Sequence, residues 1–347
     1  MHISILVALT NEERKQIVKV DDIIRLVEEN KNSKQYCISV FDLNQTYGSF
    51  RAIDGISFNV EYGKVFGFLG PNGAGKTTTI KILTTLMQPS SGTVRIFDKD
   101  ILLHSMEIRK RIGVVMQQPS FEANLTVERA LDLYGFMWKL PSRKRKEKVM
   151  ELLDAFDLES LRNIKNDELS IGQRRRVQVA REFMHDMDLL FLDEPTVGLD
   201  PSARRTLLDY IKTQVRDGLT VFFTTHIMEE AEYLCDQVAI IDKGKIIAFD
   251  TPTELKRKYG EVKHVEIKLK NVSAQSVLYL VDSMMSGKKS YIETPELNTL
   301  RISSTDAQEI MIKAIESLSK NGIQIENIAI NSPSLEDVFL NVINNRA

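Results

Sequence analysis

Two kinds of pattern alternate along this chain, short apolar runs and longer segments of mixed polarity. The apolar or alternating runs predict β-strands at YCISVFDL, AIDGISFNV, KVFGFLG, TVRIFD, IGVVM, DLLFLDEP, TVFFTTH and the hairpin VAIIDKGKIIAFD. Helices are predicted between them at TTTIKILTTLM, TVERALDLYGFMWKL, SRKRKEKVMELLDAF, SARRTLLDYIKTQVRDG and IMEEAEYLCD, with one more after LSIGQ. Because strands alternate with helices, we expect an α/β fold with a mainly parallel sheet covered on both faces.

Changes in the pattern divide the chain into three expected parts. Residues 1–36 hold a short apolar run and a helical pattern without a motif, and we treat them as an N-terminal extension of unknown role. Residues 37–258 form the α/β part, in which the mostly helical stretch at about 118–170 predicts a helical subdomain. Residues 259–347 follow the order β-α-β-β-α-β with a terminal helix, which predicts a small ferredoxin-like α/β domain.

Composition narrows the class of protein. With 347 residues, 43% apolar and 27% charged, the chain has the make-up of an ordinary globular protein of two or three domains. Its net charge of −2 provides no basic field, so we expect no nucleic acid as a partner. No run approaches the roughly 18 apolar residues of a membrane span. The early run ISILVAL has no basic flank before it and no small-residue cleavage site after it, so we interpret it as structure rather than a signal peptide.

Cysteine and histidine residues indicate no metal framework. Cys37 and Cys235 stand far apart, and the five histidines have no ligand-like spacing. We therefore expect neither a zinc site nor a structural disulfide, and we expect a cytoplasmic chain.

The stretch GPNGAGKTTTIKIL at residues 70–83 carries the first chemical signal. It fits G-x-x-x-x-G-K-[ST], between a predicted strand and a predicted helix, which is the context of a phosphate-binding loop. Lys76 is expected to reach the β- and γ-phosphates and Thr77 to bind Mg²⁺. The alternative is a glycine-rich turn with a capping threonine. The residues expected to bind the nucleotide here are Gly70, Pro71, Asn72, Gly73, Ala74, Gly75, Lys76, Thr77 and Thr78.

Two carboxylates follow the apolar strand in LLFLDEP. A strand that ends in Asp193 is expected to place that carboxylate beside the Mg²⁺ site. Glu194 can orient the water that attacks the γ-phosphate, which favours an ATPase. The alternative for Glu194 is a solvated acid at a strand end.

The stretch LSIGQRRRV at residues 169–177 spans the start of a predicted helix over residues 171–184. Ser170 is expected to cap that helix, and Gly172 to let backbone approach a phosphate. Between a phosphate loop and an aspartate–glutamate strand, this stretch resembles the signature motif of ATP-binding cassette (ABC) ATPases. The resemblance implies the P-loop NTPase fold and a head-to-tail pair, in which each ATP lies between one P-loop and the signature helix of a second copy or a homologous subunit.

The other motifs of the family are also present in order. The resemblance assigns Tyr47 in QTYGSF to adenine stacking, Gln117 in VVMQQP to the Q-loop, Gly198, Leu199 and Asp200 to the D-loop, and His226 to the switch histidine. It implies that Gln117 joins Thr77 and Asp193 at Mg²⁺, and that Glu194, His226 and Lys76 are catalytic. A tyrosine before a strand also suits packing or a turn, and Gln118 is the alternative to Gln117.

One residue departs from the family signature. Ile171 stands where the commonest signature has glycine, which leaves Ser170, Gly172 and Gln173 to supply the phosphate contacts. The change makes the local backbone stiffer.

The last part of the chain bears a further resemblance. Its ending NSPSLEDVFL is similar to the extension on ATPase subunits of ABC-2-type exporters, the daunorubicin-resistance type among them. The alternative is a generic stabilising domain. The basic run SRKRKEK at residues 142–148 suits a solvated helix face, with lipid headgroups or nucleic acid as the alternative contact.

The resemblances imply an ATP- and Mg²⁺-dependent ATPase subunit at the cytoplasmic face of the membrane, working on separate transmembrane subunits that SFEANLTVERAL is expected to touch. The alternatives are a soluble ABC ATPase without a transport role and a nucleotide-binding regulator with negligible turnover. A single P-loop and only 93 residues between Lys76 and Ser170 (positions 77 to 169) argue against translation-type and chromosome-type members. Glu194 and His226 argue against the regulator.

Overall fold

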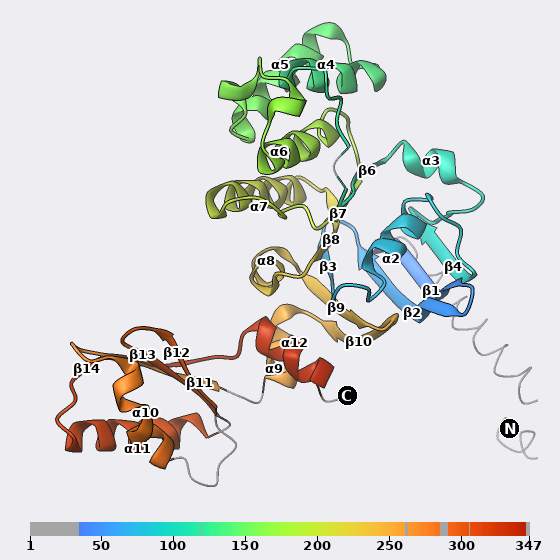
Figure 1. The fold of residues 1–347 in the computed structure, drawn as a ribbon. Helices are drawn as coiled ribbons and strands as arrows, with labels where there is room; N and C mark the ends of the chain where they lie inside the picture. Colours follow the sequence, from blue (N-terminus) through green and yellow to red (C-terminus); the bar gives the residue numbers. More distant parts are fainter. Residues whose placement is uncertain (1–34, 119, 261–262, 285–290, 305, 345–347) are drawn as a thin grey trace, which may run out of the picture. The chain divides into compact units, whose positions relative to one another are not determined.

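A computed structural model describes residues 35–118, 120–260, 263–284, 291–304 and 306–344 (Figure 1). The helical pattern expected before residue 35 lies outside these residues. Contacts divide the chain into two units. The first holds the residues before Val65 together with Thr77–Phe222, and the second holds Val65–Lys76 together with the residues from Phe223 onward.

An antiparallel sheet in the first unit has the strand order β2-β1-β4-β5. The strands are β1 Tyr36–Tyr47, β2 Phe50–Glu61, β4 Ser91–Ile96 and β5 Lys99–Asp100. β1 is longer than expected, because residues 44–47 continue its pairing with β2 until Tyr47 lies opposite Phe50. Alternate residues such as Ile38, Val40 and Ile56 are buried, as expected for a sheet with one covered face.

The predicted mainly parallel sheet has six strands in the order β10-β9-β3-β8-β7-β6. They are β3 Val65–Leu69, β6 Ile112–Val115, β7 Leu189–Asp193, β8 Thr220–Thr225, β9 Gln237–Asp242 and β10 Lys245–Asp250. The pairs β3–β9 and β6–β7 are parallel, and β9–β10 is the antiparallel hairpin. Every residue of β3, β7 and β8 is buried, which explains why these strands appear in the sequence as continuous apolar runs.

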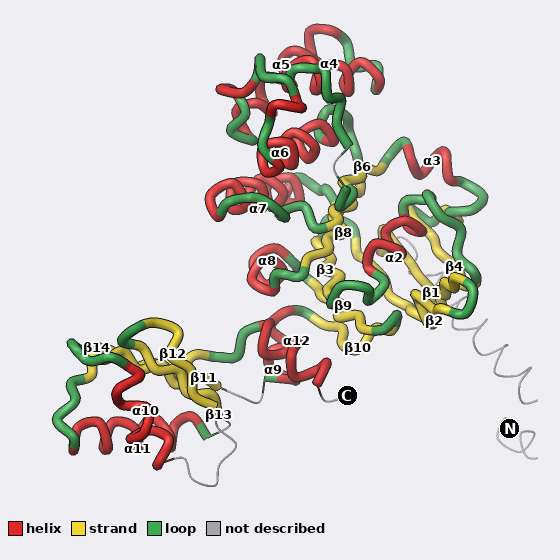
Figure 2. Tube along the Cα trace, viewed as in Figure 1, coloured by secondary structure: helices red, strands yellow, loops and turns green. Residues whose placement is uncertain are grey.

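The helices of the first unit include the expected helical stretch. They are α2 Lys76–Leu83, α3 Ser105–Arg109, α4 Val127–Met137, α5 Ser142–Ala155, α6 Ile171–Glu182 and α7 Pro201–Arg216, with short 3₁₀ turns at Glu159–Leu161 and Asn166–Glu168. α4 packs against both α5 and α6, and the three helices lie together in Figure 2. The side chain of Thr126 caps α4 by accepting from the Arg129 amide, and the ring of Trp138 stacks on His185 with 3.9 Å between centroids.

The second unit ends in the predicted β-α-β-β-α-β segment. Its elements are β11 Lys263–Leu269, α10 Ala274–Met284, β12 Tyr291–Glu296, β13 Thr299–Ser304, α11 Ala307–Lys320 and β14 Ile325–Asn331. The strand order β12-β13-β11-β14, antiparallel at every pairing, is that of a ferredoxin-like sheet and confirms the prediction. Val265, Ile267 and Leu269 alternate on one face of β11 and form a core with Ile310 and Leu318 of α11.

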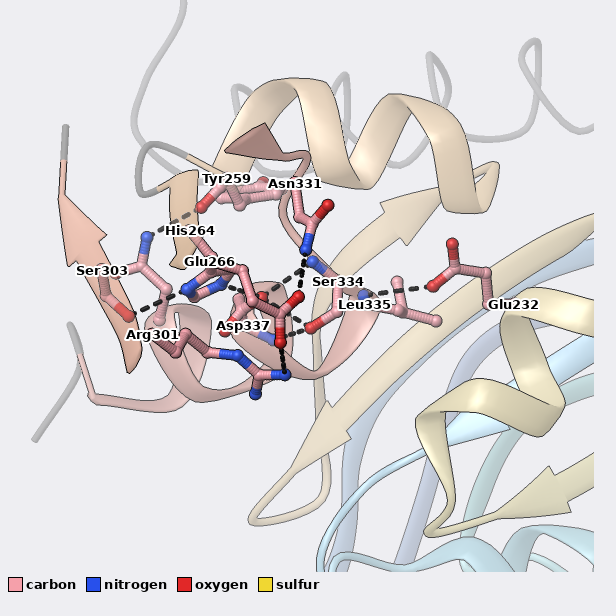
Figure 3. Close-up of polar contacts among 11 residues, drawn as sticks. Glu232, Tyr259, His264, Glu266, Arg301, Ser303, Asn331, Ser334, Leu335 and Asp337 are labelled. Carbon is pink, nitrogen blue, oxygen red and sulfur yellow. Dashed lines mark hydrogen bonds and ion pairs between the residues drawn. The ribbon is translucent and has the colours of Figure 1, made fainter. Parts of the chain in front are cut away.

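Three further helices of this unit pack together. They are α8 Met228–Leu234, α9 Pro252–Tyr259 and α12 Leu335–Asn344, and α12 contacts both others. The Asn341 amide donates to the Tyr259 carbonyl at 2.8 Å. Figure 3 shows the His264 ring between Ser303 and Asp337, and its nitrogens lie 2.8 Å from Ser303 Oγ and from Asp337 Oδ2. Most of the stretch PSLEDVFL, on which the resemblance to ABC-2-type exporter subunits depends, lies in helix α12.

Candidate nucleotide site

The loop between β3 and α2 folds around the side chain of Lys76. Gly75 has φ +110°, a left-handed conformation that favours glycine, and the Ala74 amide donates to the Pro71 carbonyl at 3.2 Å. Lys76 is buried, and its Nζ donates to the carbonyls of Gly70 at 2.7 Å and Pro71 at 3.2 Å. The loop thus holds an ammonium group at the start of α2, where helix amides favour an anion.

Thr77 and Asp193, predicted from separate motifs, are hydrogen-bonded to each other. Thr77 Oγ1 donates to Asp193 Oδ2 at 2.9 Å, and Asp193 is 1% exposed at the end of β7. A hydroxyl and a carboxylate are the hard oxygen ligands that Mg²⁺ prefers. The chemistry of this pair therefore fits the expected metal.

Glu194 and Gln117 are the second predicted pair in contact. Gln117 Nε2 donates to Glu194 Oε2 at 3.1 Å, which favours Gln117 over Gln118 for the Q-loop role. Glu194 is buried, and its backbone has φ +48°, a left-handed conformation that costs a residue with a side chain roughly 1–3 kcal/mol. Such strain is characteristic of functional sites, where surrounding contacts hold it in place.

Sequence reasoning missed Arg175, which lies against both carboxylate positions. Arg175 is 3% exposed, and its guanidinium donates to the carbonyls of Asp193 and Glu194, at 2.7 Å each, and of Pro195 at 3.1 Å. It also donates to the Met116 carbonyl at 2.6 Å. Burial lowers the pKa of Arg175 to about 10, although the charges of Asp193 and Glu194 act in the opposite direction. The available signal was its spacing, three residues after Gly172 and so on the same face of α6.

The signature stretch forms a capping box at the start of α6. The Gln173 amide donates to Ser170 Oγ at 3.2 Å, and the Ser170 amide donates to Gln173 Oε1 at 2.9 Å, which confirms the predicted cap. A Cβ at Gly172 would lie 2.6 Å from the Gly198 carbonyl oxygen. The glycine is thus needed where α6 approaches the D-loop. Ile171, the departure from the family signature, is 65% exposed.

Asp200, Tyr47 and His226, the other residues predicted for the site, lie outside the two bonded pairs. Asp200 caps α7 by accepting from the Ala203 amide at 3.0 Å, and this hydrogen bond lowers the pKa of the carboxyl group. Tyr47 is 47% exposed and donates to Met87 Sδ at 3.1 Å. His226 follows the last residue of β8 and is exposed. The structure thus brings Thr77, Asp193, Glu194 and Gln117 into two bonded pairs, whereas Tyr47 and Asp200 bond to residues outside these pairs.

No helix within the described ranges combines the length and apolar character needed to cross a bilayer.

A family model described as ABC transporter matches residues 53–197. The chain is 33% identical over 309 residues to a daunorubicin resistance ATP-binding protein of Streptomyces coeruleorubidus. The aligned residues cover 88% of this chain and 95% of the relative. It is 35% identical over 304 residues to a daunorubicin/doxorubicin resistance ATP-binding protein of Streptomyces peucetius (87% and 91% covered). It is 31% identical over 301 residues to a linearmycin resistance ATP-binding protein of Bacillus subtilis (87% and 96% covered).

Solved structures agree with these relatives. An ATP-binding subunit of an ABC transporter superposes with a TM-score of 0.60 at 29% identity, over 65% of this chain and 93% of that one. An ATP-binding cassette solved as a dimer in a post-hydrolysis state with ADP and Pi gives a TM-score of 0.58 at 25% identity, over 62% and 98%. These likenesses establish the expected P-loop NTPase fold for the corresponding part of the chain.

Proposed function

The chain belongs to the ABC transporter family and is the ATPase subunit of a transporter, and we propose that it powers export of a drug-like or antibiotic-like compound. Three relatives that match nearly their whole length are resistance proteins, for daunorubicin, doxorubicin and linearmycin. The C-terminal similarity to ABC-2-type exporters supports the same direction of transport.

The residues of the loop and its surroundings have distinct proposed roles in binding ATP. Residues 70–78 bind the phosphates through backbone amides and through Lys76, and Tyr47 stacks on the adenine. Thr77, Asp193 and Gln117 hold Mg²⁺, which supplies positive charge to the phosphates when bound. The Thr77–Asp193 hydrogen bond supports this ligand set, because it brings two of the oxygens together.

Hydrolysis is assigned to Glu194, with His226 and Lys76 stabilising the charge that develops on the γ-phosphate. The observation that carries this assignment is the buried Glu194 carboxylate, directly after the Mg²⁺ ligand Asp193 and bonded to Gln117. A carboxylate in this position accepts a proton from water and orients it for in-line attack. The Gln117 amide holds the carboxylate in one orientation.

The protein works as a head-to-tail pair with a second copy or a homologous subunit. Ser170, Gly172, Gln173 and Asp200 contact the ATP bound by the partner, and the exposed N-terminus of α6 supports this role. Residues 120–131 contact the membrane subunits, which hold the pair at the cytoplasmic face of the membrane. ATP closes the pair and hydrolysis reopens it, a population shift that the membrane subunits convert into transport.

The export role is tested in a host that carries the membrane subunits. Tagged wild-type protein should be recovered from washed membranes together with those subunits and should raise tolerance to an anthracycline-type compound. Glu194→Gln should be recovered in the same fraction but should give the tolerance of an empty vector, because the subunits assemble without hydrolysis. Equal tolerance in both strains, or wild-type protein only in the soluble fraction, would reject the proposal.

A further inference from the structure

Arg175 is a buried cation that the proposed mechanism does not use. It lies on α6, five residues after Ser170, and its guanidinium joins three segments of the chain. Nη2 donates to the carbonyls of Asp193, at the end of β7, and of Glu194, while Nε donates to the Pro195 carbonyl. Nη1 donates to the Met116 carbonyl before Gln117. Nη1 also donates to Gln178 Oε1 at 2.8 Å, one turn along α6.

These acceptors are all neutral, and among the described residues Arg175 forms no ion pair. Burying a guanidinium whose hydrogen-bond acceptors are neutral oxygens carries a desolvation cost that an apolar side chain would avoid. Packing alone therefore does not account for an arginine here. Its rigid set of five N–H donors does something an apolar residue cannot, which is to fix several backbone carbonyls at once.

The carbonyls that Arg175 fixes are those around the strained residue Glu194. The left-handed backbone of Glu194, φ +48°, requires neighbours that hold it. Arg175 donates to the carbonyl before it, to its own carbonyl and to the carbonyl after it. It thereby restricts the backbone that aims the Glu194 carboxylate.

We propose that Arg175 is the positioning residue that holds Glu194 in its hydrolytic orientation and ties it to the Gln117 loop and to the helix that begins at Ser170. The inference rests on the proposed role of Glu194. In a head-to-tail pair, the N-terminus of α6 faces the partner's ATP while Glu194 acts on the chain's own ATP. Arg175 then connects, within one chain, the groups that serve the two nucleotides.

The test is Arg175→Lys, compared with Arg176→Lys. Lysine keeps the charge, but its single ammonium cannot reach the Met116 carbonyl and the three carbonyls of residues 193–195 together. We expect kcat for ATP hydrolysis to fall at least about tenfold, while KM and the Kd for Mg-ATP stay within about twofold of wild type. Arg176 makes the matched control, because its guanidinium also donates to carbonyls, those of Phe156 and Asp157. Arg176→Lys should stay within about twofold in kcat.

A second variant covers the case in which Arg175→Lys does not fold. Gln178→Met leaves Arg175 in place and keeps a side chain of similar length, but it removes the Gln178 oxygen that accepts from Arg175. We therefore expect kcat to fall several-fold while ATP affinity stays unchanged. Wild-type kcat in Arg175→Lys, or in Gln178→Met if Arg175→Lys is unfolded, overturns the proposal. The proposal is also overturned if kcat and ATP affinity fall in equal proportion and the Tm falls with them, because that result indicates a structural role only. Wild-type turnover in Glu194→Gln would reject the role of Glu194 itself, and the two failures are thus distinct.

Discussion

Lys76 is the residue whose substitution tests nucleotide binding most directly. Its Nζ lies among the loop carbonyls of Gly70 and Pro71, and the side chain is 6% exposed. An ammonium buried in a loop of its own chain is well placed to exchange these carbonyls for phosphate oxygens, which bind a cation more strongly.

Lys76→Ala should therefore weaken Mg-ATP binding by at least about tenfold, since a charge-assisted hydrogen bond contributes roughly 1.5–3 kcal/mol. Titration with a fluorescent ATP analogue measures the change. Lys81→Ala on the same helix is the control, because Lys81 is exposed near the far end of α2 and should bind as wild type does. An unchanged Kd in Lys76→Ala would refute the assignment of the loop.

At this scale the sequence was informative where a motif names both a residue type and a spacing. Asp193 and Glu194 were predictable because an apolar strand ends in two acids, and Thr77 because it follows the loop lysine. Arg175 was not, because it is the middle of three arginines and a helical arginine is usually solvated. Only the structure shows that its neighbours are backbone carbonyls, which have no sequence signature.

The elements were predictable where apolar runs are long or caps are explicit. The central strands and the helices α4 to α7 follow this rule, and α7 begins with Asp200 as its cap and proline in its first turn. The short α3 and the two-residue β5 were missed, because each has too few residues for a period. α9 was missed although TPTE is a capping signal, in which Thr251 accepts from the Glu254 amide.

Helix α12 is held at its first turn by a carboxylate, and its stability should depend on pH. Asp337 accepts from Ser334 and contacts His264 (Figure 3). Burial alone would raise the pKa of Asp337, but the hydrogen bonds from Ser334 and His264 lower the net value below 3.8. A carboxyl group with a lowered folded-state pKa stabilises the fold above its unfolded pKa, and this contribution is lost as the pH falls toward the folded-state pKa.

Asp337→Asn keeps the shape but removes this charge. We expect hydrogen exchange of the α12 amides at pH 7 to be about fivefold faster in the variant. This corresponds to about 1 kcal/mol, because the asparagine oxygen can still accept a hydrogen bond and only the charge is lost. As the pH falls through the lowered folded-state pKa of Asp337, the protection factors of wild type and variant should converge. Glu336→Gln, one residue earlier on the exposed face, is the control and should follow wild type. A constant difference between wild type and Asp337→Asn across the pH range would contradict the account.

The whole molecule combines a cassette with an additional α/β domain, and we propose the boundary near residue 258 that the sequence pattern suggests. The order of elements was predictable from periodicity, and the antiparallel ferredoxin-like pairing followed from it. The strand order of the six-stranded sheet was not predictable from the sequence, because parallel strands are joined by long crossover connections that leave no local signal. The local sequence pattern also gives no signal for pairing between two chains, and the head-to-tail pair was inferred from the family resemblance alone.

We propose that the partner is a second copy of the chain, which closes with its Ser170 over the ATP that the first copy holds. Substitutions at Ser170 can separate charge from capping, because aspartate and asparagine both cap helices as well as serine does. Ser170→Asp keeps the cap but presents a negative charge to the partner's triphosphate, whereas Ser170→Asn keeps the cap without the charge.

The most direct measurement is the mass in solution of the Glu194→Gln protein with Mg-ATP, by sedimentation or light scattering. Because hydrolysis is blocked, we expect the 39.6 kDa chain to double in mass with ATP but not with ADP. Adding Ser170→Asp should leave a monomer that still binds ATP, and adding Ser170→Asn should leave the dimer. A Glu194→Gln chain that stays monomeric in saturating ATP, or a dimer that Ser170→Asp does not weaken, would contradict the account.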